Sequence, residues 1–387
     1  MQKPIISIFL PTLLIGGAEK SLVELANGLA DMGWRIQLLV MAREGPLIDE
    51  IKENVDLIDL GCSSFSQAVF LLARYYKKHR PLVILTSVYA TGLAAIAAKI
   101  VSGYKPKVVI GAHNSLQAKF ERPDNIKDKY LLKLLCKLLF PWADGFVAVS
   151  KSLALELETL IQLPKYRIRT IYNPVVSQKM LARADEQLTH PWLAMPTQRD
   201  FKTLISVGRL VEQKGFDVLL DALIIVRKYS DCRLIIVGDG PLRTDLESRV
   251  NRLRLEGNVD FVGWQDNPYK FVTRSDLFVL SSRWEGLGNV LIEALACGCP
   301  VVATDCQYGP KEILDGGKYG DLVEVNNASD LASKILTTLQ ASVSPAKSDA
   351  RKSRSLDFTV EAAVEQYSQY FSEIWLKTDR TLAQNCS

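Results

Sequence analysis

Short apolar runs rich in β-branched residues alternate with longer amphipathic stretches along nearly the whole chain. The runs predict strands at residues 5–10, 36–40, 82–86, 108–111 and 146–149, and a second set at 203–207, 233–237, 259–262, 277–280 and 300–303. The stretches between them predict helices, among them 19–32, 216–229 and 242–253. Apolar strands that alternate with helices are typical of parallel sheets covered on both faces. Two such sets predict an α/β protein with two doubly wound, Rossmann-like domains.

A polar stretch punctuated by prolines separates the two sets of strands, between residues 174 and 203. We therefore expect one domain at residues 1–175 and a second at 176–355. A final amphipathic helix is too short to be a domain, so residues 356–387 are expected to pack back on the first one, after a polar connection at 342–355. Because ligands of open parallel sheets bind beyond the carboxyl ends of the strands, we expect those ends to line one cleft.

Composition indicates a globular protein that stays in the cytoplasm. Hydrophobic residues make up 48% and charged residues 23% of the chain. No apolar run reaches the roughly 20 residues that a membrane-spanning helix needs. The apolar start could resemble a signal peptide, but Pro11 interrupts it and a helical pattern follows, which favours a first strand and its loop.

Metal chemistry has little support in the sequence. A single residue separates Cys297 from Cys299, and no histidine is near them in the sequence. This spacing favours buried thiols over a zinc site. The chain has only three histidines and no Asp-x-Asp, so we expect neither a metal nor another cofactor.

Positive charge is concentrated in the first half of the chain. Residues 1–175 hold 22 Lys and Arg against 15 Asp and Glu, and residues 99–137 hold nine basic and three acidic residues. Such a stretch could face anionic lipid or a phosphorylated acceptor, or it could be a solvated helix face. Nucleic acid is not expected as a partner, because no aromatic and basic interleaving accompanies the charge.

One helix within this basic stretch could contact a membrane. Lys129, Lys133 and Lys137 share a helical face, with leucines around the rest. This pattern predicts peripheral contact with an anionic membrane. A buried helix in front of the strand 146–149 explains the leucines equally well.

The segment 283–300 carries the strongest candidate chemistry. Glu285 follows the expected strand 277–280, and Gly286 and Gly288 leave the backbone free to turn there. The next N–H groups can face an anion because they begin a helix. They belong to Asn289, Val290 and Leu291.

Glu293 lies one turn beyond Asn289 and shares its face of the helix. A carboxylate, an anion-binding helix start and a second carboxylate suit a sugar, a diphosphate and a ribose. The order predicts a sugar nucleotide as ligand. It argues against Glu285 and Glu293 being an acid–base couple, as in glycoside hydrolysis.

Other candidates follow expected strands. Arg209 and Lys214 could hold two phosphates, although a surface loop with ordinary charges is the alternative. His113 could donate to a sugar hydroxyl or a phosphate, whereas a lone histidine is more often structural. Gly16 and Gly17 would allow close approach of a phosphate or substrate. No Gly-x-Gly-x-x-Gly follows a strand, which counts against a nicotinamide dehydrogenase.

Taken in order, five motifs resemble the retaining glycosyltransferases of family 4. They are Gly-Gly-Ala-Glu-Lys from Gly16, Gly-Arg-Leu-x3-Lys-Gly from Gly208, Val-Gly-Asp-Gly-Pro-Leu from Val237, Phe-Val-Gly-Trp from Phe261, and the pair Glu285 and Glu293. The resemblance runs from about Ile5 to the final helix. It implies the GT-B fold, with an acceptor-side first domain and a donor-side second domain. The segment 304–314 is similar to a subgroup that builds bacterial surface polysaccharides and lipid-linked oligosaccharides.

The resemblance also implies roles for the candidate residues. Glu285 would bind the donor-sugar hydroxyls near the reacting face, and His113 would lie by the sugar. Glu293 would hold the ribose hydroxyls. The other implied donor contacts are Gly16 and Gly17 under the phosphates, Arg209 and Lys214 on the diphosphate, Gly263 near the base, and Gly288, Asn289, Val290 and Leu291 at the helix start.

These observations predict a retaining, metal-independent glycosyltransferase of the cytoplasm. It would move a hexose or N-acetylhexosamine from a nucleotide diphosphate sugar, UDP-linked by preference, to a glycan or polyprenyl-diphosphate-linked acceptor. Peripheral attachment to the inner face of the bacterial membrane would fit that acceptor. The alternatives on the same fold are a sugar-nucleotide epimerase and a non-catalytic nucleotide-sugar-binding protein.

Overall fold

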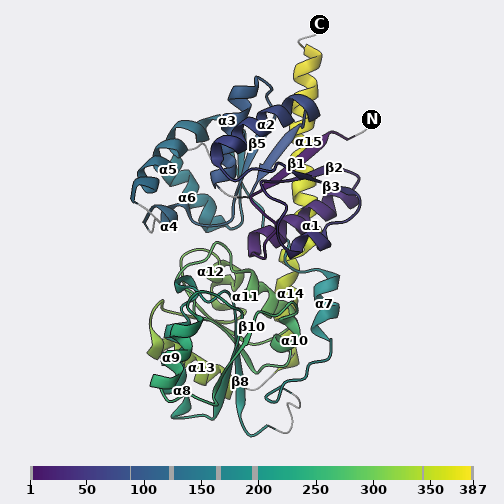
Figure 1. Ribbon diagram of the computed structural model, residues 1–387. Coiled ribbons are helices and arrows are strands. Elements are labelled where there is room, and N and C mark those ends of the chain that lie inside the picture. The colour runs from purple at the N-terminus through teal and green to yellow at the C-terminus, as the bar shows by residue number, and fades with distance from the viewer. Residues whose placement is uncertain are drawn as a thin grey trace. The chain divides into compact units, whose positions relative to one another are not determined.

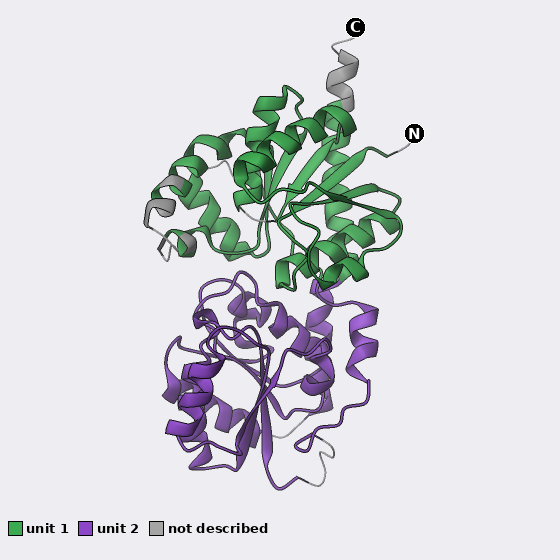
Figure 2. Ribbon diagram, viewed as in Figure 1, with its two compact units in different colours: residues 1–174, 360–387 green, residues 175–359 purple. Residues whose placement is uncertain are grey.

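The computed structural model describes residues 3–87, 89–121, 126–162, 167–193, 199–341 and 344–384. The chain forms two compact units, one of residues 1–174 with 360–387 and one of residues 175–359 (Figure 2). Each unit is built on a single parallel sheet with helices packed against it (Figure 1). The predicted α/β class with two Rossmann-like sheets is therefore confirmed.

The sheet of the first unit has the strand order β3-β2-β1-β4-β5-β6-β7. Its strands are β1 (Ile5–Leu10), β2 (Arg35–Val40), β3 (Val55–Asp59), β4 (Val83–Thr86), β5 (Lys107–Ala112), β6 (Gly145–Ala148) and β7 (Ile168–Thr170). The α-helices are α1 (Gly17–Asp31), α2 (Phe65–His79), α3 (Tyr89–Ser102), α4 (Leu116–Glu121), α5 (Ile126–Leu139), α6 (Lys151–Ile161) and α15 (Val360–Gln384). The central strands are buried along their length because helices cover both of their faces.

Helix α15 completes the first unit by packing on α1. The indole N–H of Trp34, which follows α1, donates to Ser368 Oγ at 2.9 Å, and its ring meets Phe371 edge-on at 6.3 Å between centroids. A Cβ on Gly28 of α1 would stand 2.4 Å from Cγ2 of Val364, so the two helices approach closely. The chain thus returns to the first unit through apolar and aromatic packing.

The sheet of the second unit has the strand order β10-β9-β8-β11-β12-β13. Its strands are β8 (Lys202–Val207), β9 (Cys232–Val237), β10 (Val259–Gly263), β11 (Leu277–Leu280), β12 (Val301–Thr304) and β13 (Asp321–Val323). The α-helices are α7 (Gln178–Ala184), α8 (Phe216–Arg227), α9 (Arg243–Arg252), α10 (Tyr269–Val272), α11 (Asn289–Ala296), α12 (Pro310–Ile313), α13 (Ala328–Gln340) and α14 (Pro345–Ser355). Apolar residues of α8, α13 and the strands form its core.

Each sheet has one switch point, which is the pair of neighbouring strands from which successive strands are added in opposite directions. The switch point lies between β1 and β4 in the first unit and between β8 and β11 in the second. Such points leave a crevice at the carboxyl ends of the two strands, which is where open α/β sheets bind ligands. The loops after these strands are therefore the places to look for a site.

The sequence predicted only a polar connection at 342–355, without a helix. Most of it forms α14, which packs on α11. The Arg351 guanidinium donates to the carbonyl oxygen of Gly298 at 2.9 and 3.1 Å, and Ser348 Oγ donates to the same oxygen at 3.2 Å. Because α14 has few apolar residues, these hydrogen bonds hold it against the end of α11. A search for apolar periodicity does not detect a helix of this kind.

Candidate active site

Glu285 lies in the loop after β11, beside the switch point of the second unit. Its side chain is buried, with 5% of the residue exposed. Lys214, at the end of the loop after β8, places Nζ 2.6 Å from Glu285 Oε1. Ser282 Oγ donates to the same oxygen at 2.7 Å. The structure therefore brings together two of the predicted residues, one from each side of the switch point, as a buried ion pair.

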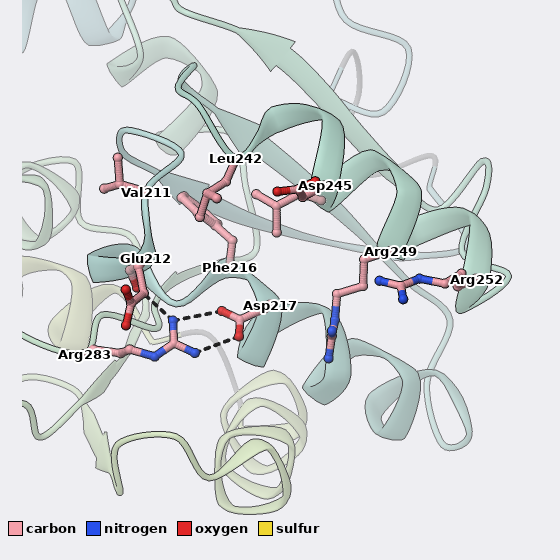
Figure 3. A pocket seen from close by; sticks show the side chains of 10 residues that line it. Val211, Glu212, Phe216, Asp217, Leu242, Asp245, Arg249, Arg252 and Arg283 are labelled. Carbon is pink, nitrogen blue, oxygen red and sulfur yellow. Dashed lines mark hydrogen bonds and ion pairs between the residues drawn. The ribbon is translucent and has the colours of Figure 1, made fainter.

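A second ion pair, between Arg283 and Asp217, connects the two loops that carry Lys214 and Glu285. Arg283 donates to both carboxylate oxygens of Asp217, at 3.0 and 2.6 Å, and to the carbonyl oxygen of Glu212 at 2.7 Å (Figure 3). Burial raises the pKa of Asp217, but the hydrogen bonds and charge of Arg283 outweigh it, so this pKa lies below its ordinary value. The pair therefore stays charged at neutral pH.

A pocket of about 250 Å³ lies beside this ion pair, between α8 and α9 (Figure 3). It is lined by Val211, Glu212, Phe216, Asp217, Leu242, Asp245, Leu246, Arg249, Arg252 and Arg283. None of the predicted site residues belongs to this lining. The pocket is therefore a neighbour of the candidate site and not a part of it.

Arg209 stands in the loop after β8 with an exposed side chain. The loop that carries Arg209 contacts the loop after β9, because the N–H of Leu210 donates to the carbonyl oxygen of Asp239 at 2.9 Å. Gly238 has a φ of 137°, and a Cβ there would stand 2.0 Å from the carbonyl oxygen of Gly208. The two glycines of the Val-Gly-Asp-Gly motif thus allow two loops to pack backbone to backbone.

Helix α11 begins directly after Gly288, whose φ of 98° favours glycine. Asn289 and Val290 are half-buried at the helix start. The N–H of Leu291 donates to the carbonyl oxygen of Gly288 at 2.9 Å, so it is engaged within the first turn. This differs from the expectation that all three N–H groups face a ligand. Glu293 is half-buried one turn further along.

Gly263 ends β10 with a φ of 73°. Its carbonyl oxygen accepts from the N–H of Gly238 at 2.8 Å, which joins the ends of β9 and β10. Trp264 follows and is 52% exposed. An aromatic surface beside the strand end is compatible with the predicted position of a base.

Cys306 is a buried residue close to Glu285 that the sequence did not single out. Burial raises the pKa of its thiol to about 12, and the negative charge of Glu285 adds to this effect. The thiol stays protonated at neutral pH. It is therefore not a nucleophile, because the thiolate is the reactive form.

Gly16 and Gly17 lie at the start of α1, after β1 of the first unit. A Cβ on Gly16 would stand 2.1 Å from Oε2 of Glu19, so the Glu19 carboxylate folds back over the helix start. Burial raises the pKa of Glu19, and a bond to its own backbone N–H opposes this. A phosphate that approached the two glycines would meet this carboxylate, which the sequence did not predict.

His113 follows β5 of the first unit and is buried, with 7% of the residue exposed. Burial lowers the pKa of its imidazole to about 4, and the side chain of Asn173 partly opposes this. The ring is therefore neutral at neutral pH. The next loop is held by Glu156 of α6, which accepts from Ser115 Oγ and from the N–H of Leu116, each at 2.7 Å.

The candidate residues thus fall into two groups. Arg209, Lys214, Gly263, Glu285, Gly288, Asn289, Val290, Leu291 and Glu293 belong to the second unit, at or near the carboxyl ends of its strands. Gly16, Gly17 and His113 belong to the same edge of the first unit. The supporting residues Ser282, Asp217 and Glu156 were missed, because their roles depend on partners far away in the sequence. Of these residues, only Ser282 lies near its partner in the sequence, three positions before Glu285.

Comparisons with known proteins agree with this arrangement. Residues 15–179 match the model of the Glycosyltransferase Family 4, and residues 195–353 match that of the Glycosyl transferases group 1. The N-acetylgalactosamine-N,N'-diacetylbacillosaminyl-diphospho-undecaprenol 4-alpha-N-acetylgalactosaminyltransferase of Campylobacter jejuni is 30% identical over 88% of this chain and 91% of its own. The N-acetyl-alpha-D-glucosaminyl L-malate synthase of Bacillus anthracis is 30% identical over 62% of this chain and 61% of its own.

Solved structures show the same fold. Sucrose-phosphate synthase from Thermosynechococcus elongatus has a TM-score of 0.81 at 20% identity, over 97% of this chain and 100% of its own. Anabaena HepE in complex with UDP and glucose has a TM-score of 0.74 at 21% identity, over 95% of this chain and 99% of its own. The predicted GT-B class is thereby confirmed. The chain belongs to the family 4, group 1 glycosyltransferases, and it is a glycosyltransferase as the motifs predicted.

Proposed function

We propose that this enzyme moves a hexose or N-acetylhexosamine from a UDP-linked donor to a sugar acceptor, with retention of configuration and without a metal. The buried Lys214–Glu285 pair at the switch point of the second unit is the observation that carries this proposal. It offers a cation for a leaving phosphate and a carboxylate for sugar hydroxyls in one place. HepE, which shares the fold, has been crystallised with UDP and glucose, and this supports UDP as the nucleotide.

The second unit supplies the groups that stabilise the leaving diphosphate. Lys214 and the exposed Arg209 bring positive charge, and the start of α11 adds the N–H groups of Asn289 and Val290. Glu293 holds the ribose hydroxyls, and Gly263 lies by the base. This charge stabilisation replaces the one that a divalent ion would give.

The reaction proceeds on one face of the donor sugar. The acceptor oxygen forms the bond to the anomeric carbon as the bond from that carbon to the phosphate oxygen breaks. The acceptor proton passes to an oxygen of the departing diphosphate. A protein nucleophile is not required: Cys306 is protonated, and Glu285 Oε1 already accepts bonds from Lys214 and Ser282. Glu285 binds the donor-sugar hydroxyls, and neutral His113 lies by the sugar.

The acceptor is a glycan or a sugar linked to polyprenyl diphosphate, in bacterial surface polysaccharide synthesis. The Campylobacter jejuni relative is named for a diphospho-undecaprenol substrate. Other relatives are named for lipopolysaccharide core synthesis in Rhizobium meliloti. These names support an acceptor carried by a lipid or a glycan.

Helix α5 gives the first unit a surface suited to an anionic membrane. Tyr130, Leu134 and Leu138 recur every fourth residue and are 68%, 53% and 58% exposed. The exposed Lys133 and Lys137 lie beside this apolar stripe. An exposed stripe of this kind suits an interfacial helix, which inserts apolar side chains and pairs lysines with anionic lipid. The side chain of Lys129, the third predicted lysine, lies outside the described residues. No described helix is long and apolar enough to span a bilayer.

The transfer reaction is tested by incubating the pure protein with a panel of nucleotide sugars and acceptors, followed by mass spectrometry. We expect a new glycoside and free UDP from one UDP-sugar, with no loss of rate when EDTA is added. Release of an epimerised nucleotide sugar without an acceptor would contradict the proposal in favour of an epimerase. Binding without turnover would favour a non-catalytic protein.

The membrane contact is tested by co-sedimentation with vesicles that contain phosphatidylglycerol. We expect binding that weakens with salt and is lost when Leu134 and Leu138 are changed to Ser, or Lys133 and Lys137 to Gln. Lys77→Gln together with Lys78→Gln on α2 is the matched control, which should leave binding unchanged. Equal sedimentation of all these variants would contradict a role for α5.

A further inference from the structure

The two oxygens of the buried Glu285 carboxylate have different surroundings. Oε1 accepts from Lys214 Nζ at 2.6 Å and from Ser282 Oγ at 2.7 Å. Oε2 lies 3.5 Å from Nε2 of Gln213, which is longer than a regular hydrogen bond, and no described residue donates to it at a shorter distance. Each oxygen of an ionised carboxylate can accept two hydrogen bonds. Oε1 is therefore filled, whereas Oε2 keeps capacity for a ligand.

Gln213 belongs to the 3₁₀ helix η5 (Glu212–Lys214), which leads into α8. Its side chain is half-buried, and its Nε2 also donates to the carbonyl oxygen of Trp284 at 2.9 Å. Both groups that face Nε2 are acceptors, so the orientation of the amide follows from its partners. The Gln213 amide thus contacts both Glu285 and the residue before it.

The bond to Trp284 restricts the direction of the Glu285 side chain. The peptide group between Trp284 and Glu285 is held on its carbonyl side by Gln213 at 2.9 Å and on its N–H side by the carbonyl oxygen of Gln307 at 3.4 Å. The bond from Gln213 is the shorter of the two. Because a peptide group is planar, a bond to its carbonyl oxygen also limits movement of the Cα of Glu285, from which the side chain extends.

The two loops do not need the Gln213 side chain to stay together. The N–H of Arg283 donates to the carbonyl oxygen of Gln213 at 2.7 Å, and its guanidinium donates to that of Glu212 at 2.7 Å. Ser281 Oγ donates to the carbonyl oxygen of Lys214 at 2.8 Å. All three acceptors are backbone atoms of η5, so these bonds remain when the Gln213 side chain is changed. Attachment of the loops therefore does not account for the amide.

We propose that Gln213 is a positioning residue that directs Oε2 of Glu285 toward a hydroxyl group of the donor sugar. Oε1 stays bound to Lys214 and Ser282 and anchors the carboxylate. The sugar hydroxyl supplies the regular donor that Oε2 lacks, and a hydrogen bond to an ionised acceptor is a strong one. This inference rests on the proposed glycosyl transfer and deepens it, because it names the oxygen that binds the sugar and the residue that directs this oxygen.

The test is calorimetric titration of the full chain with UDP and with UDP-glucose, UDP-galactose, UDP-N-acetylglucosamine and UDP-N-acetylgalactosamine. The quantity compared is the donor ratio, which is the affinity for the tightest-binding UDP-sugar divided by the affinity for UDP. Gln213→Met and Gln213→Leu each remove the amide and keep a side chain of similar size. We expect each to lower the donor ratio by about three- to tenfold, with the affinity for UDP unchanged.

A double-mutant cycle distinguishes positioning from a separate contact with the sugar. Glu285→Gln alone should lower the donor ratio, because it removes the ionised acceptor. Gln213→Met added to Glu285→Gln should lower the ratio no further, because Gln213 acts through the carboxylate.

Asn267→Leu is the matched control. The Asn267 amide also donates to a backbone carbonyl and to a carboxylate of the second unit, those of Arg183 at 2.7 Å and Glu186 at 2.8 Å. Its removal should lower the melting temperature and leave the donor ratio unchanged.

Three results would overturn the inference, given that Glu285→Gln lowers the donor ratio. One is a donor ratio in Gln213→Met and Gln213→Leu equal to that of the original chain. A second is a loss of UDP affinity in these variants as large as the loss of UDP-sugar affinity, which would make the role of Gln213 structural. The third is an equal effect of Gln213→Met with and without Glu285→Gln. Failure of the original chain to bind UDP or any of the four UDP-sugars, or an unchanged ratio in Glu285→Gln, would instead count against the proposed function.

Discussion

At the scale of single residues, the pairing of Lys214 with Glu285 distinguishes this site from two charges on a surface loop. Only 17% of the Lys214 side chain and 6% of the Glu285 side chain are exposed. Burial of two charges is expensive, and pairs of this kind are often no more stable than apolar residues of the same size. A ligand that uses both charges accounts for the presence of such a pair at the switch point.

Lys214→Met should lower stability by about 3 kcal/mol, because it leaves the Glu285 carboxylate buried without its cation. The double variant Lys214→Met with Glu285→Leu should recover most of that loss and still have no transfer activity. Urea denaturation of the three proteins measures this. If the double variant were no more stable than Lys214→Met, the pair would not be coupled as described.

His113 makes the first unit sensitive to acid. Its pKa in the folded chain is about 4, below the ordinary value near 6.5, so the unfolded chain binds the proton more readily between these values. Stability should fall by about 3 kcal/mol as pH decreases through this window, and it should be fully present above it. His113→Gln should flatten this part of the curve of melting temperature against pH. An unchanged curve would contradict the neutral, buried imidazole.

At the scale of elements, one ion pair joins the start of α8 to the loop after β11. Arg283 and Asp217 hold the backbone that carries Lys214 and Glu285, and neither residue touches the ion pair of the site itself. This is a positioning role. Loss of such support typically weakens a site because its groups are held less accurately.

Asp217→Asn should therefore lower kcat/KM for the donor by about tenfold through loosened positioning, with a small effect on melting temperature. Asp221→Asn is the matched control. It lies one turn further along α8 and pairs with Arg249 of α9 at 2.6 Å, and it should leave kcat/KM unchanged. Equal effects of the two variants on kcat/KM would show that the Asp217 pair is only structural.

The elements also show what the sequence could predict. All ten expected strands exist, because long apolar runs in buried parallel strands carry a clear pattern. The strands β3, β7 and β13 were missed because they lie at or near sheet edges and mix polar with apolar residues. Lys214 and Glu285 were identified by their motifs. Their contact depends on which strands are neighbours, and that order is not written in any local pattern.

At the scale of the whole molecule, the C-terminal helix belongs to the first unit. Gly28→Ala should lower the melting temperature by about 2–4 °C, because the new Cβ would stand 2.4 Å from Cγ2 of Val364, a stiff β-branched side chain. The same change made in a Val364→Ala background should not lower it. A Gly28→Ala effect that is equal in both backgrounds would contradict close packing of α1 on α15.

The central claim is that a nucleotide diphosphate sugar binds at Lys214 and Glu285. Its most direct test is calorimetric titration of the protein with UDP and with the UDP-sugar donor. Lys214→Met should weaken UDP and donor alike by about ten- to a hundredfold, since it removes a charge-assisted contact to phosphate. Glu285→Gln should bind UDP like the original chain and lose the added affinity that the sugar provides. UDP affinity that is unchanged in Lys214→Met, or reduced as much by Glu285→Gln, would contradict this assignment.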